Sequence, residues 1–455
     1  MPAGPHIPST FLVTGPVGRA VWSLAWPTIL TNVLQTSYGF VNLIFVGSLG
    51  KASIAAVAFA NSALFWQFAA LLGVMVGNTA LVSRSTGAGN PKDAEIATRQ
   101  SLLLALAGAV LTAVPMILLH QGILSVLGAE PQVITIAAPY LNVCLYASPL
   151  FFLSMVLASS LRGIGDTRTP LIAMGVQVAL NVLGDWVLIF GVGPFPALGV
   201  TGAAWATLFS RVASLAVLGL LFTRTPLAGA LRGPYRVDWG WMKRILNIGL
   251  PATAQAVLRT TGSSVYQGIV ARTVEGTTAV AALSIGIQAE SLAFMPGFAF
   301  GVAATAMVGQ NLGAGQPARA RRAGWLSMVQ GMIIMSAMGV LFFLLAQPFS
   351  RLISQEADVV ALGAAYLMIN APSEPFLAMA MVLTGALNGA GQTRVPAVLT
   401  FLSLWVLRLP MTWLLALHLS MGATGAWISM AVTTGLGGLF TAAYYKWGRW
   451  AATRV

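Results

Sequence analysis

The stretch YLNVCLYASPLFFLSMVLASSLRGIGDTRTP at residues 140–170 returns at residues 366–396 as YLMINAPSEPFLAMAMVLTGALNGAGQTRVP. The two stretches match without a gap at 12 of 31 positions and lie 226 residues apart. The same offset superimposes GAGNP at residues 87–91 on GAGQP at residues 313–317. Two motifs that share one offset predict a duplicated chain. In a membrane protein, duplicated halves are typical of a transporter whose site lies where the repeats meet.

The composition around these repeats is that of a membrane protein. Of the 455 residues, 57% are hydrophobic and 8% are charged, and the mean hydropathy is +0.82, whereas about 25% of residues are charged in soluble proteins. Continuous apolar runs exclude the alternating pattern of a β-barrel. We therefore expect an all-α integral membrane protein with twelve transmembrane helices in two homologous six-helix lobes. The runs, each of about 20 residues or more, lie at residues 20–47, 54–83, 94–119, 132–160, 170–191, 199–222, 241–271, 278–309, 323–346, 359–387, 395–417 and 422–446.

The distribution of Lys and Arg predicts the orientation in the membrane. On the side of the N-terminus the loops and helix ends hold eighteen of them, whereas the opposite loops hold only Lys51, Arg272 and Arg351. The positive-inside rule then places both termini in the cytoplasm, as expected of a multi-pass protein of the plasma (inner) membrane. The net charge of +13 follows from this topology and from contact with anionic lipid, which argues against a nucleic-acid partner.

Domain boundaries follow from the same pattern. The region around residues 224–240 is rich in Arg, Gly and Pro and is typical of a linker. Because each half has an even number of crossings, we expect a parallel repeat with a pseudo-two-fold axis along the membrane normal. The expected parts are an N-terminal cytoplasmic tail, an N-lobe, a linker, a C-lobe and a C-terminal cytoplasmic tail, at residues 1–18, 19–223, 224–240, 241–446 and 447–455.

Four segments resemble the multidrug and toxic compound extrusion (MATE) family of cation-coupled antiporters, in its bacterial type. They are LAWPTILTNVLQTSYGFVNLIFVGSLG at residues 24–50, the pair LRGIGDTRTP and LNGAGQTRVP, and IGIQAESLAFMPGFAFGVAATAMVGQNLGAGQPARA at residues 285–320. The resemblance extends over essentially the whole chain. It implies two six-helix lobes around a central cavity. It also implies export of organic, often cationic, compounds in exchange for H⁺ or Na⁺ by alternating access.

Three acidic residues, Asp185, Glu290 and Glu374, lie at predicted membrane depth. A charge at the bilayer centre costs at least about 2.5–3.5 kcal/mol, so such residues usually face water or a partner. Asn181 and Asp185 are spaced i, i+4 and project from one helix face, where they could share a cation or a proton-linked hydrogen-bond network. The resemblance places the family's N-lobe cation site at this pair. Alternatively, Asn181 and Asp185 could form a hydrogen bond that holds packed helices together.

The first helix carries a polar stripe of Thr31, Gln35, Tyr38 and Asn42 on one face, which predicts residues that line a cavity. Such stripes can also hold membrane helices together. The resemblance places an acid, commonly Asp, where this chain has Asn42. An amide can coordinate Na⁺ but cannot carry a proton, so either Asp185 alone handles coupling or coupling has moved to the other lobe. We further expect three residues of other helices to line the substrate cavity: Tyr140, Thr207 and Gln255.

In the second half, the resemblance places acidic positions of the family at Glu290 and Glu374. Arg259 and Glu290 each lie 12 residues from the outer ends of neighbouring antiparallel helices, at equal depth by the rise of about 1.5 Å per residue. We therefore expect a structural ion pair between them. Glu374 precedes Pro375, which kinks a helix, so it could be a protonation site beside a hinge or a packing residue. Arg211 and Arg408 have no partner that the sequence identifies.

Motifs of other classes do not appear. The chain has no GxxxxGK[ST] nucleotide loop, no HExxH and no His cluster, and its GAG loops follow apolar helices instead of strands, so they are turns and not phosphate sites. One cysteine, Cys144, cannot form an internal disulfide or a Cys-cluster metal site. We expect a non-enzyme without a cofactor, with H⁺ or Na⁺ as coupling ion and with no metal beyond a possible Na⁺ at Asp185. The expected partners are small organic substrates and membrane lipids, and the expected state is a monomer.

Other transport classes fit less well. A lipid-linked oligosaccharide flippase of the same superfamily is the main alternative, although such flippases usually have fourteen helices and a strongly basic central cavity. A major-facilitator carrier would need GxxxD and paired Arg/Lys residues in the loop where this chain has SRSTGAGNPKD. A channel would need a filter segment between helices, and an intramembrane enzyme would need a polar catalytic cluster.

Overall fold

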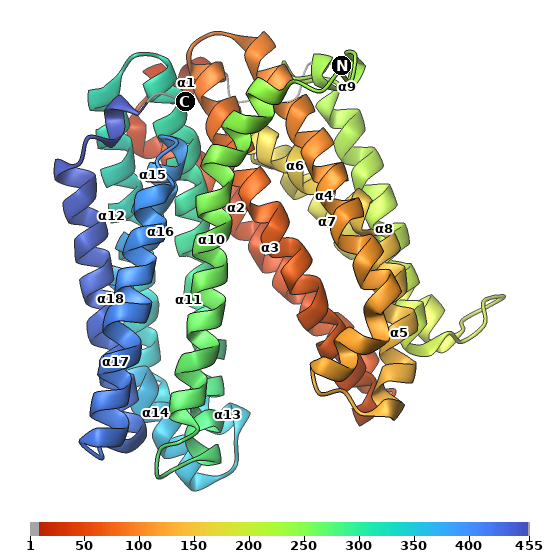
Figure 1. The fold of residues 1–455 in the computed structure, drawn as a ribbon, viewed down its shortest axis with the longest axis vertical. Coiled ribbons are helices and arrows are strands. Elements are labelled where there is room, and N and C mark those ends of the chain that lie inside the picture. Colours follow the sequence, from red (N-terminus) through yellow and green to blue (C-terminus); the bar gives the residue numbers. More distant parts are fainter. Residues whose placement is uncertain (1–8, 454–455) are drawn as a thin grey trace. The chain divides into compact units, whose positions relative to one another are not determined.

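The computed structural model describes residues 9–453, and within them every regular element is helical (Figure 1). The chain divides into two compact units, unit 1 with residues 26–250 and unit 2 with residues 9–25 and 251–453. Residues 1–8 and 454–455 of the predicted tails lie outside the described residues. The all-α prediction is confirmed.

Two long helices, α2 (Val17–Gly47) and α10 (Trp239–Val270), contribute to both units. Unit 1 also holds α3 (Lys51–Gly87), α4 (Pro91–Val126), α5 (Pro131–Tyr146), α6 (Ser148–Gly163), α7 (Arg168–Phe190), α8 (Gly199–Phe222) and α9 (Gly229–Arg232). Unit 2 also holds α1 (Ser9–Thr14), α11 (Thr277–Gly313), α12 (Pro317–Leu344), α13 (Ala346–Ile353), α14 (Ala357–Asn370), η1 (Ala371–Ser373), α15 (Glu374–Gly389), α16 (Arg394–Phe401), η2 (Leu402–Arg408), α17 (Leu409–Thr412), η3 (Trp413–His418), α18 (Gly422–Trp447) and η4 (Trp450–Ala452).

Eleven of the twelve predicted apolar runs correspond to helical spans. In the described part of the chain, ten segments are long and apolar enough to cross a membrane, and an eleventh is added if α5 and α6, bent by 48°, count as one span. The remaining run corresponds to α10, which has 32 residues but is too polar for the same test. The reason is a set of polar side chains on α10 that includes Gln255, Arg259 and Gln267.

The two units repeat one packing scheme. In unit 1, α3 packs on α4, α5 and α6, and in unit 2, α11 packs on α12, α14 and α15. The helix breaks correspond as well, since Pro149 follows the break between α5 and α6, and Pro375 follows the break at η1. Proline cannot donate the helical hydrogen bond and pushes its ring against the preceding turn. The repeat read from the sequence is therefore a repeat of packing.

Repeated glycines allow the central helices of each unit to approach closely. A Cβ at Gly163 would lie 2.9 Å from Val82 Cγ1, and a Cβ at Gly389 would lie 2.2 Å from the backbone oxygen of Thr305. Two residues further on, Gly165 and Gly391 have φ of 90° and 80°, a conformation that residues with a Cβ rarely adopt. These glycines explain why LRGIGDTRTP and LNGAGQTRVP share their pattern.

The residues at the start of the first half pack on residues of the second half, and the linker packs on residues of the first half. In unit 2, Arg319 donates to the carbonyl groups of Leu12 and Gly15, Gln330 donates to the carbonyl of Gly18, and Trp22 contacts Phe300 with ring centroids 5.9 Å apart. In unit 1, Arg99 binds the carbonyl of Gly229 at 2.7 Å. The units therefore begin within α2 and α10, next to Pro27 and Pro251, and differ there from the predicted lobe boundaries at residues 19 and 241.

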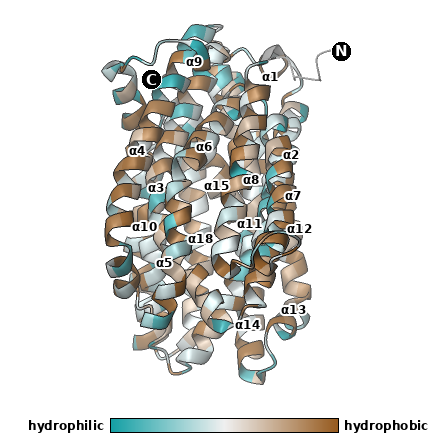
Figure 2. Cartoon of the chain, turned by 90° about the vertical axis from the view of Figure 1, so that its right-hand side faces the viewer, coloured by the Kyte–Doolittle hydropathy of each residue, from teal (hydrophilic) through white to brown (hydrophobic). Residues whose placement is uncertain are grey.

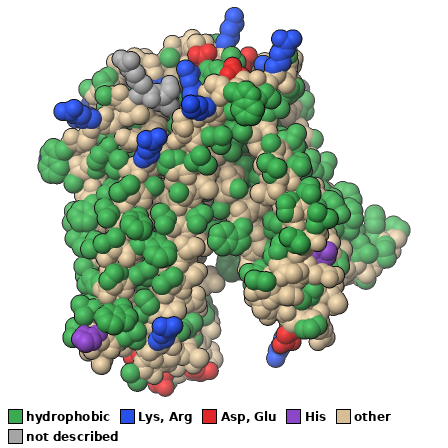
Figure 3. All heavy atoms as spheres, viewed as in Figure 1, with side chains coloured by type: hydrophobic (Ala, Val, Ile, Leu, Met, Phe, Trp, Pro, Cys, Tyr) green, Lys and Arg blue, Asp and Glu red, His purple; other side chains and the backbone are tan. Residues whose placement is uncertain are grey.

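Side-chain character follows the helices as expected for a protein in lipid. Hydrophobic residues predominate along the helix shafts, and hydrophilic residues concentrate near α9 and other helix ends (Figure 2). Large exposed apolar side chains are frequent on both units, among them Leu111, Leu118, Leu220 and Ile333. Figure 3 shows that hydrophobic side chains cover much of the visible surface. Lys and Arg side chains gather at the end that carries α9 in unit 1.

Candidate functional site

Asp185 lies on α7 with no exposed surface. The Asn42 side chain of α2 donates from Nδ2 to Asp185 Oδ2 over 3.2 Å, and Asn42 is itself buried. Both residues belong to unit 1. The structure thus brings together the carboxylate that the sequence singled out and the amide at the position where the resemblance had led us to expect an acid.

Asn181 joins this pair to α8. When its amide nitrogen faces Asp185, the nitrogen lies 2.9 Å from Oδ2, and its oxygen accepts from the hydroxyl and the backbone N–H of Thr207 over 3.3 and 3.2 Å. In the reverse orientation, Asn181 forms only a 3.3 Å bond from Nδ2 to the Thr207 hydroxyl, and its oxygen faces Asp185 Oδ2, which is also an acceptor. The orientation with the amide nitrogen toward Asp185 is therefore the favoured one. Tyr38 contacts the same hydroxyl over 3.2 Å. These five residues, Tyr38, Asn42, Asn181, Asp185 and Thr207, form what we call the Asp185 cluster.

One carboxylate oxygen of the cluster is unused. Asp185 Oδ1 is buried and has no hydrogen-bond partner among the described residues, whereas Oδ2 receives the amides. A buried charge without a partner is costly, and a proton or a bound cation on Oδ1 would remove that cost. The cluster also offers hydroxyl and amide oxygens from Tyr38, Thr207 and Asn42, which are hard ligands of the kind that suit alkali and alkaline-earth cations.

The other predicted cavity residues of unit 1 lie in different surroundings. Thr31 is buried and donates to the carbonyl of Pro27 over 2.8 Å, within its own helix. Gln35 is exposed. Tyr140 is buried in the hydrophobic core of unit 1 beside Cys144 and Leu141. The structure therefore brings Tyr38 and Thr207 to Asp185 but does not bring Tyr140 to an open surface.

Unit 2 contains a cavity of about 800 Å³ that we call the C-lobe cavity. Residues of five segments surround it, from α10, α11, the region of η1 and α15, the region of α16 and η2, and α18. Four of its lining residues carry ionisable charges: Arg259, Glu290, Glu374 and Arg408. Gln255, predicted to line a substrate cavity, lies here and donates to the Thr400 hydroxyl over 2.9 Å.

The two arginines of this cavity are held by neutral groups. Arg408, at the end of the π-helical segment η2, donates from Nε to the Thr433 hydroxyl over 2.9 Å and from Nη2 to the Thr434 hydroxyl over 2.7 Å. Arg259 is exposed, and its guanidinium carbon lies 4.8 Å from the centre of the Phe294 ring. π-Helical turns often occur at functional sites.

The expected ion pair between Arg259 and Glu290 is not formed directly: in residues 9–453, no hydrogen bond or salt bridge joins these two side chains. Glu290 Oε1 instead accepts from the Tyr366 hydroxyl over 2.5 Å. Arg259 turns toward Phe294, a residue of α11 one helical turn beyond Glu290. The two charges nevertheless attract each other across the cavity, so a structural role of the pair stays a prediction.

Glu374 stands at the break between α14 and α15. Its side chain is buried, and Oε2 has no partner within the described residues. Its Cβ would lie 3.2 Å from a Cβ placed on Gly339 of α12. The carboxylate beside Pro375 is therefore packed between helices and also borders the C-lobe cavity.

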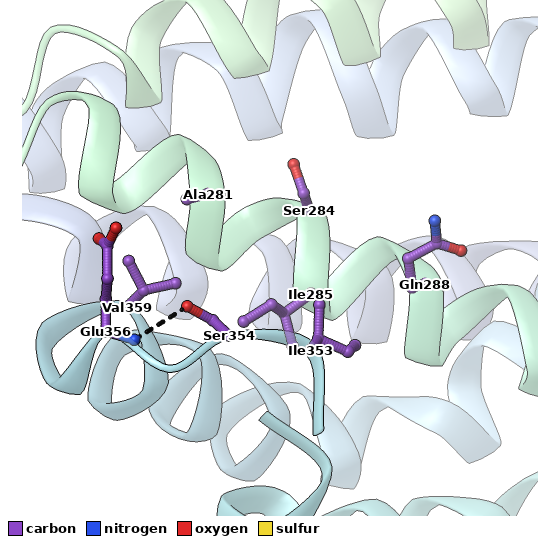
Figure 4. Close-up of a pocket in the computed structure, with 8 residues that line it drawn as sticks. All are labelled: Ala281, Ser284, Ile285, Gln288, Ile353, Ser354, Glu356 and Val359. Carbon is purple, nitrogen blue, oxygen red and sulfur yellow. Dashed lines mark hydrogen bonds between the residues drawn. The ribbon is translucent and has the colours of Figure 1, made fainter. Parts of the chain in front are cut away.

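A smaller cavity of about 440 Å³ lies elsewhere in unit 2, between α11 and the segment that joins α13 to α14 (Figure 4). Ser284, Ile285 and Gln288 line it from α11, and Glu356 is its only ionisable lining residue. The Ser354 hydroxyl accepts from the backbone N–H of Glu356 over 3.3 Å. This contact stabilises the turn that precedes α14 and indicates a structural role.

Sequence reasoning missed the surroundings of Arg408. Thr433 and Thr434 lie on α18 about 25 residues away from Arg408 along the chain, and no motif links them. The available signal was that Arg211, Arg259 and Arg408 lie deep within predicted spans, whereas the other arginines lie in loops or near the ends of spans. No group of three or more His, Cys, Asp or Glu side chains that could hold a metal ion occurs in the described part of the chain.

Comparisons with known proteins agree with this architecture. The family model MatE matches residues 27–187 and 251–414. A probable multidrug resistance protein NorM of Thermotoga maritima is 30% identical over 96% of this chain and 94% of its own length. An FAD transporter of Shewanella oneidensis is 28% identical over 95% of both chains.

Solved structures agree as well. One, described as an outward-facing conformation of a multidrug resistance MATE family transporter of the MOP superfamily, has a TM-score of 0.87 at 21% identity and covers 98% of each chain. A second MOP superfamily transporter, from Pyrococcus furiosus, has a TM-score of 0.88 at 22% identity over 98% of each chain. At this identity the likeness concerns the fold.

Proposed function

Because this chain belongs to the MATE family of transporters, we propose that it exports organic, often cationic, compounds in exchange for H⁺ or Na⁺. The similarity to multidrug resistance proteins and to an FAD transporter supports a transporter rather than an enzyme. It gives no support to the alternative of a lipid-linked oligosaccharide flippase. The protein works in this proposal as a monomer in the inner membrane, without a cofactor.

The observation that carries the proposal is the Asp185 cluster. Asp185 is fully buried, its Oδ2 accepts from Asn42 and Asn181, and its Oδ1 has no partner in the described part of the chain. A carboxylate with one free oxygen can bind a proton or a cation there, but not both at once. Antiport requires this kind of competition, because loading of one ligand must expel the other.

Coupling then follows from the contacts that surround the carboxylate. The bond from Asn42 joins α2 to α7 at Asp185, and Asn181 joins the same carboxylate to Thr207 of α8. A proton on Oδ1 removes the negative charge of Asp185 and so weakens the charge-assisted bonds that Oδ2 accepts from Asn42 and Asn181. A ligand shifts a conformational equilibrium only by its different affinity for the two states. In the proposal, the protonated and cation-bound forms of the cluster favour different arrangements of α2 against α7.

The test is transport of a cationic dye in everted vesicles, with separately imposed H⁺ and Na⁺ gradients. Wild type should move dye under one gradient, which identifies the coupling ion. Asp185→Asn should abolish gradient-driven transport while the protein stays inserted and monodisperse, because Asn cannot titrate. Asn181→Ala should reduce transport, because Asp185 loses a donor. If Asp185→Asn transports at the wild-type rate, coupling does not run through this cluster, and Glu374 becomes the candidate.

The same proposal places both termini in the cytoplasm, on the strength of the asymmetry in Lys and Arg. Cys144 is buried and is the only cysteine, so a background without it allows single-cysteine labelling. A membrane-impermeant maleimide applied to intact cells should label Arg272→Cys but not Arg232→Cys. The reverse pattern would contradict this orientation.

A further inference from the structure

We propose that the C-lobe cavity binds an anionic group of the transported compound, a carboxylate or a phosphate, between Arg408 and Arg259. The inference rests on the proposed function in one respect: it assumes that the compound bound in this cavity is the one that the protein transports. It changes the expected substrate class from simple cations to compounds that also carry an oxyanion. Neither arginine was given a substrate role from the sequence.

The first argument is the way Arg408 is held. Its Nε and Nη2 donate to Thr433 and Thr434, which fixes the plane of the guanidinium without neutralising its charge. A guanidinium has five N–H donors and keeps its proton. The remaining donors of Arg408, on the wall of the cavity, are in the fork geometry that carboxylate and phosphate groups match.

The second argument is the second guanidinium. Arg259 lines the same cavity, is exposed there, and rests on Phe294 rather than on an acid. Arg259 and Arg408 are close enough for electrostatic repulsion. Two like charges beside one cavity, each supported by neutral partners, favour binding of an anion between them.

The third argument concerns the two glutamates, which are the only carboxylates that line this cavity. Glu290 attracts both arginines, but its bonded oxygen is taken by Tyr366. Glu374 is buried at the η1 break and interacts electrostatically with Glu290. In the described part of the chain, neither glutamate forms a salt bridge with Arg259 or Arg408. The guanidinium donors therefore stay available for a ligand.

The cavity also suits the rest of an amphipathic ligand. A volume of about 800 Å³ lies within the usual range of small-molecule sites, about 300–1,000 Å³. Phe294, Met295, Leu377 and Met381 supply apolar and polarisable walls, which accept varied ring systems. A planar aromatic compound with one oxyanion fits this combination.

The experiment compares matched dyes by fluorescence polarisation on purified protein, with no gradient. Rhodamine B carries a free carboxylate, and its ethyl ester carries none but is otherwise the same cation. FMN and riboflavin form a second pair that differs by a phosphate. Wild type should bind the acid of at least one pair more tightly than the counterpart that lacks the oxyanion, and the pair that shows this preference identifies the oxyanion.

Variants connect the preference to the arginines. Arg408→Gln should weaken binding of the preferred acid by about 10- to 100-fold, as expected for loss of hydrogen bonds to a charged group, and should leave the ester or riboflavin within about twofold. Arg259→Gln should act in the same direction and serves if Arg408→Gln fails to fold. Arg321→Gln is the matched control, because Arg321 also stacks on an aromatic ring, Trp450, at 5.8 Å, but does not line the cavity.

Three results would overturn the inference: no preference for either acid, equal weakening of both members of a pair, or the same effect from Arg321→Gln. Because binding is measured at equilibrium, the outcome is separate from that of the vesicle assay. Acid binding that depends on arginine without gradient-driven transport would contradict only the proposed function. Transport without such binding would contradict only this inference.

Discussion

Asp185 and Glu374 show how two carboxylates can be buried in different ways. Asp185 has amide donors from two helices on one oxygen, whereas Glu374 packs at a helix break. Each also has an oxygen without a partner in the described part of the chain. Since unpaired buried charge is expensive, both residues are candidates for proton binding, and the donors around Asp185 make it the better-organised one.

Asn42→Asp should move the pH dependence of transport toward higher pH. The new carboxylate would lie where Asn42 Nδ2 now lies, 3.2 Å from Asp185 Oδ2, and two carboxylates this close resist simultaneous ionisation. The pair would then keep a shared proton at higher pH. Initial rates in everted vesicles measure the effect, at pH values from about 6 to about 9, because buried carboxylic acids can keep their proton up to about pH 8–9. Asn61→Asp, at an exposed position of α3, should leave the profile unchanged, and an equal shift in that control would argue against the cluster.

Tyr366→Phe should destabilise unit 2 through Glu290. The hydroxyl of Tyr366 donates to Glu290 Oε1 over 2.5 Å, and Tyr366 is fully buried with its ring 4.9 Å from that of Trp427. Removal of the donor should cost about 1–3 kcal/mol, because the carboxylate loses its partner. Thermal unfolding of purified protein measures this. Addition of Glu290→Gln should recover part of the loss, since coupled neighbours are not additive; strictly additive shifts would contradict the contact.

At the scale of elements, the close approach of α15 to α11 depends on glycine. Gly389→Ala should lower the melting temperature, because its Cβ would lie 2.2 Å from the Thr305 oxygen, and overpacking of this kind costs about 1–3 kcal/mol. Gly435→Ala on α18 is the control, since a Cβ there meets nothing within 4 Å. Alanine at that position should be neutral or stabilising, because it restricts the unfolded chain. Equal melting temperatures for the two variants would contradict the packing argument.

Two side chains of α4 hold the linker between the halves on unit 1. Gln100 donates to the carbonyl of Arg236 over 2.7 Å and accepts from the backbone N–H of Asp238 over 3.1 Å. Arg99 of α4 donates to the carbonyl groups of Gly229, Ala230 and Pro234 over 2.7, 3.3 and 3.5 Å. Arg99→Ala should therefore raise hydrogen exchange in residues 229–238 while leaving α3 and α4 protected. Arg224→Ala removes a charge nearby without removing such contacts and should leave exchange unchanged. Unchanged exchange in Arg99→Ala would show that the linker is held in another way.

At the scale of the whole molecule, the repeat and the units do not share boundaries. Residues 17–25 of α2 belong to unit 2, and residues 239–250 of α10 belong to unit 1. Unit 2 therefore includes the start of α2, although the rest of α2 belongs to unit 1. Unit 1 likewise includes the start of α10, although the rest of α10 belongs to unit 2. The predicted boundaries at 19 and 241 followed hydropathy, which records where a helix enters lipid but not which helices it packs against.

The sequence by itself determined the class of this protein. The features that show this class are local: the apolar runs, the repeat between residues 140–170 and 366–396, and the paired glycines and prolines. They decide the class because a segment crosses lipid only if it is long and apolar enough and satisfies its own backbone hydrogen bonds. The sequence also identified Asp185 and Asn181, because i, i+4 spacing fixes one helix face. Only the tertiary structure decided that Asn42 and Thr207 meet that pair, that Glu290 binds Tyr366 instead of Arg259, and that Thr433 and Thr434 hold Arg408. Such contacts join helices that are distant in sequence. The partner of each side chain depends on how its helix is rotated and on its rotamer, and local residue spacing encodes neither.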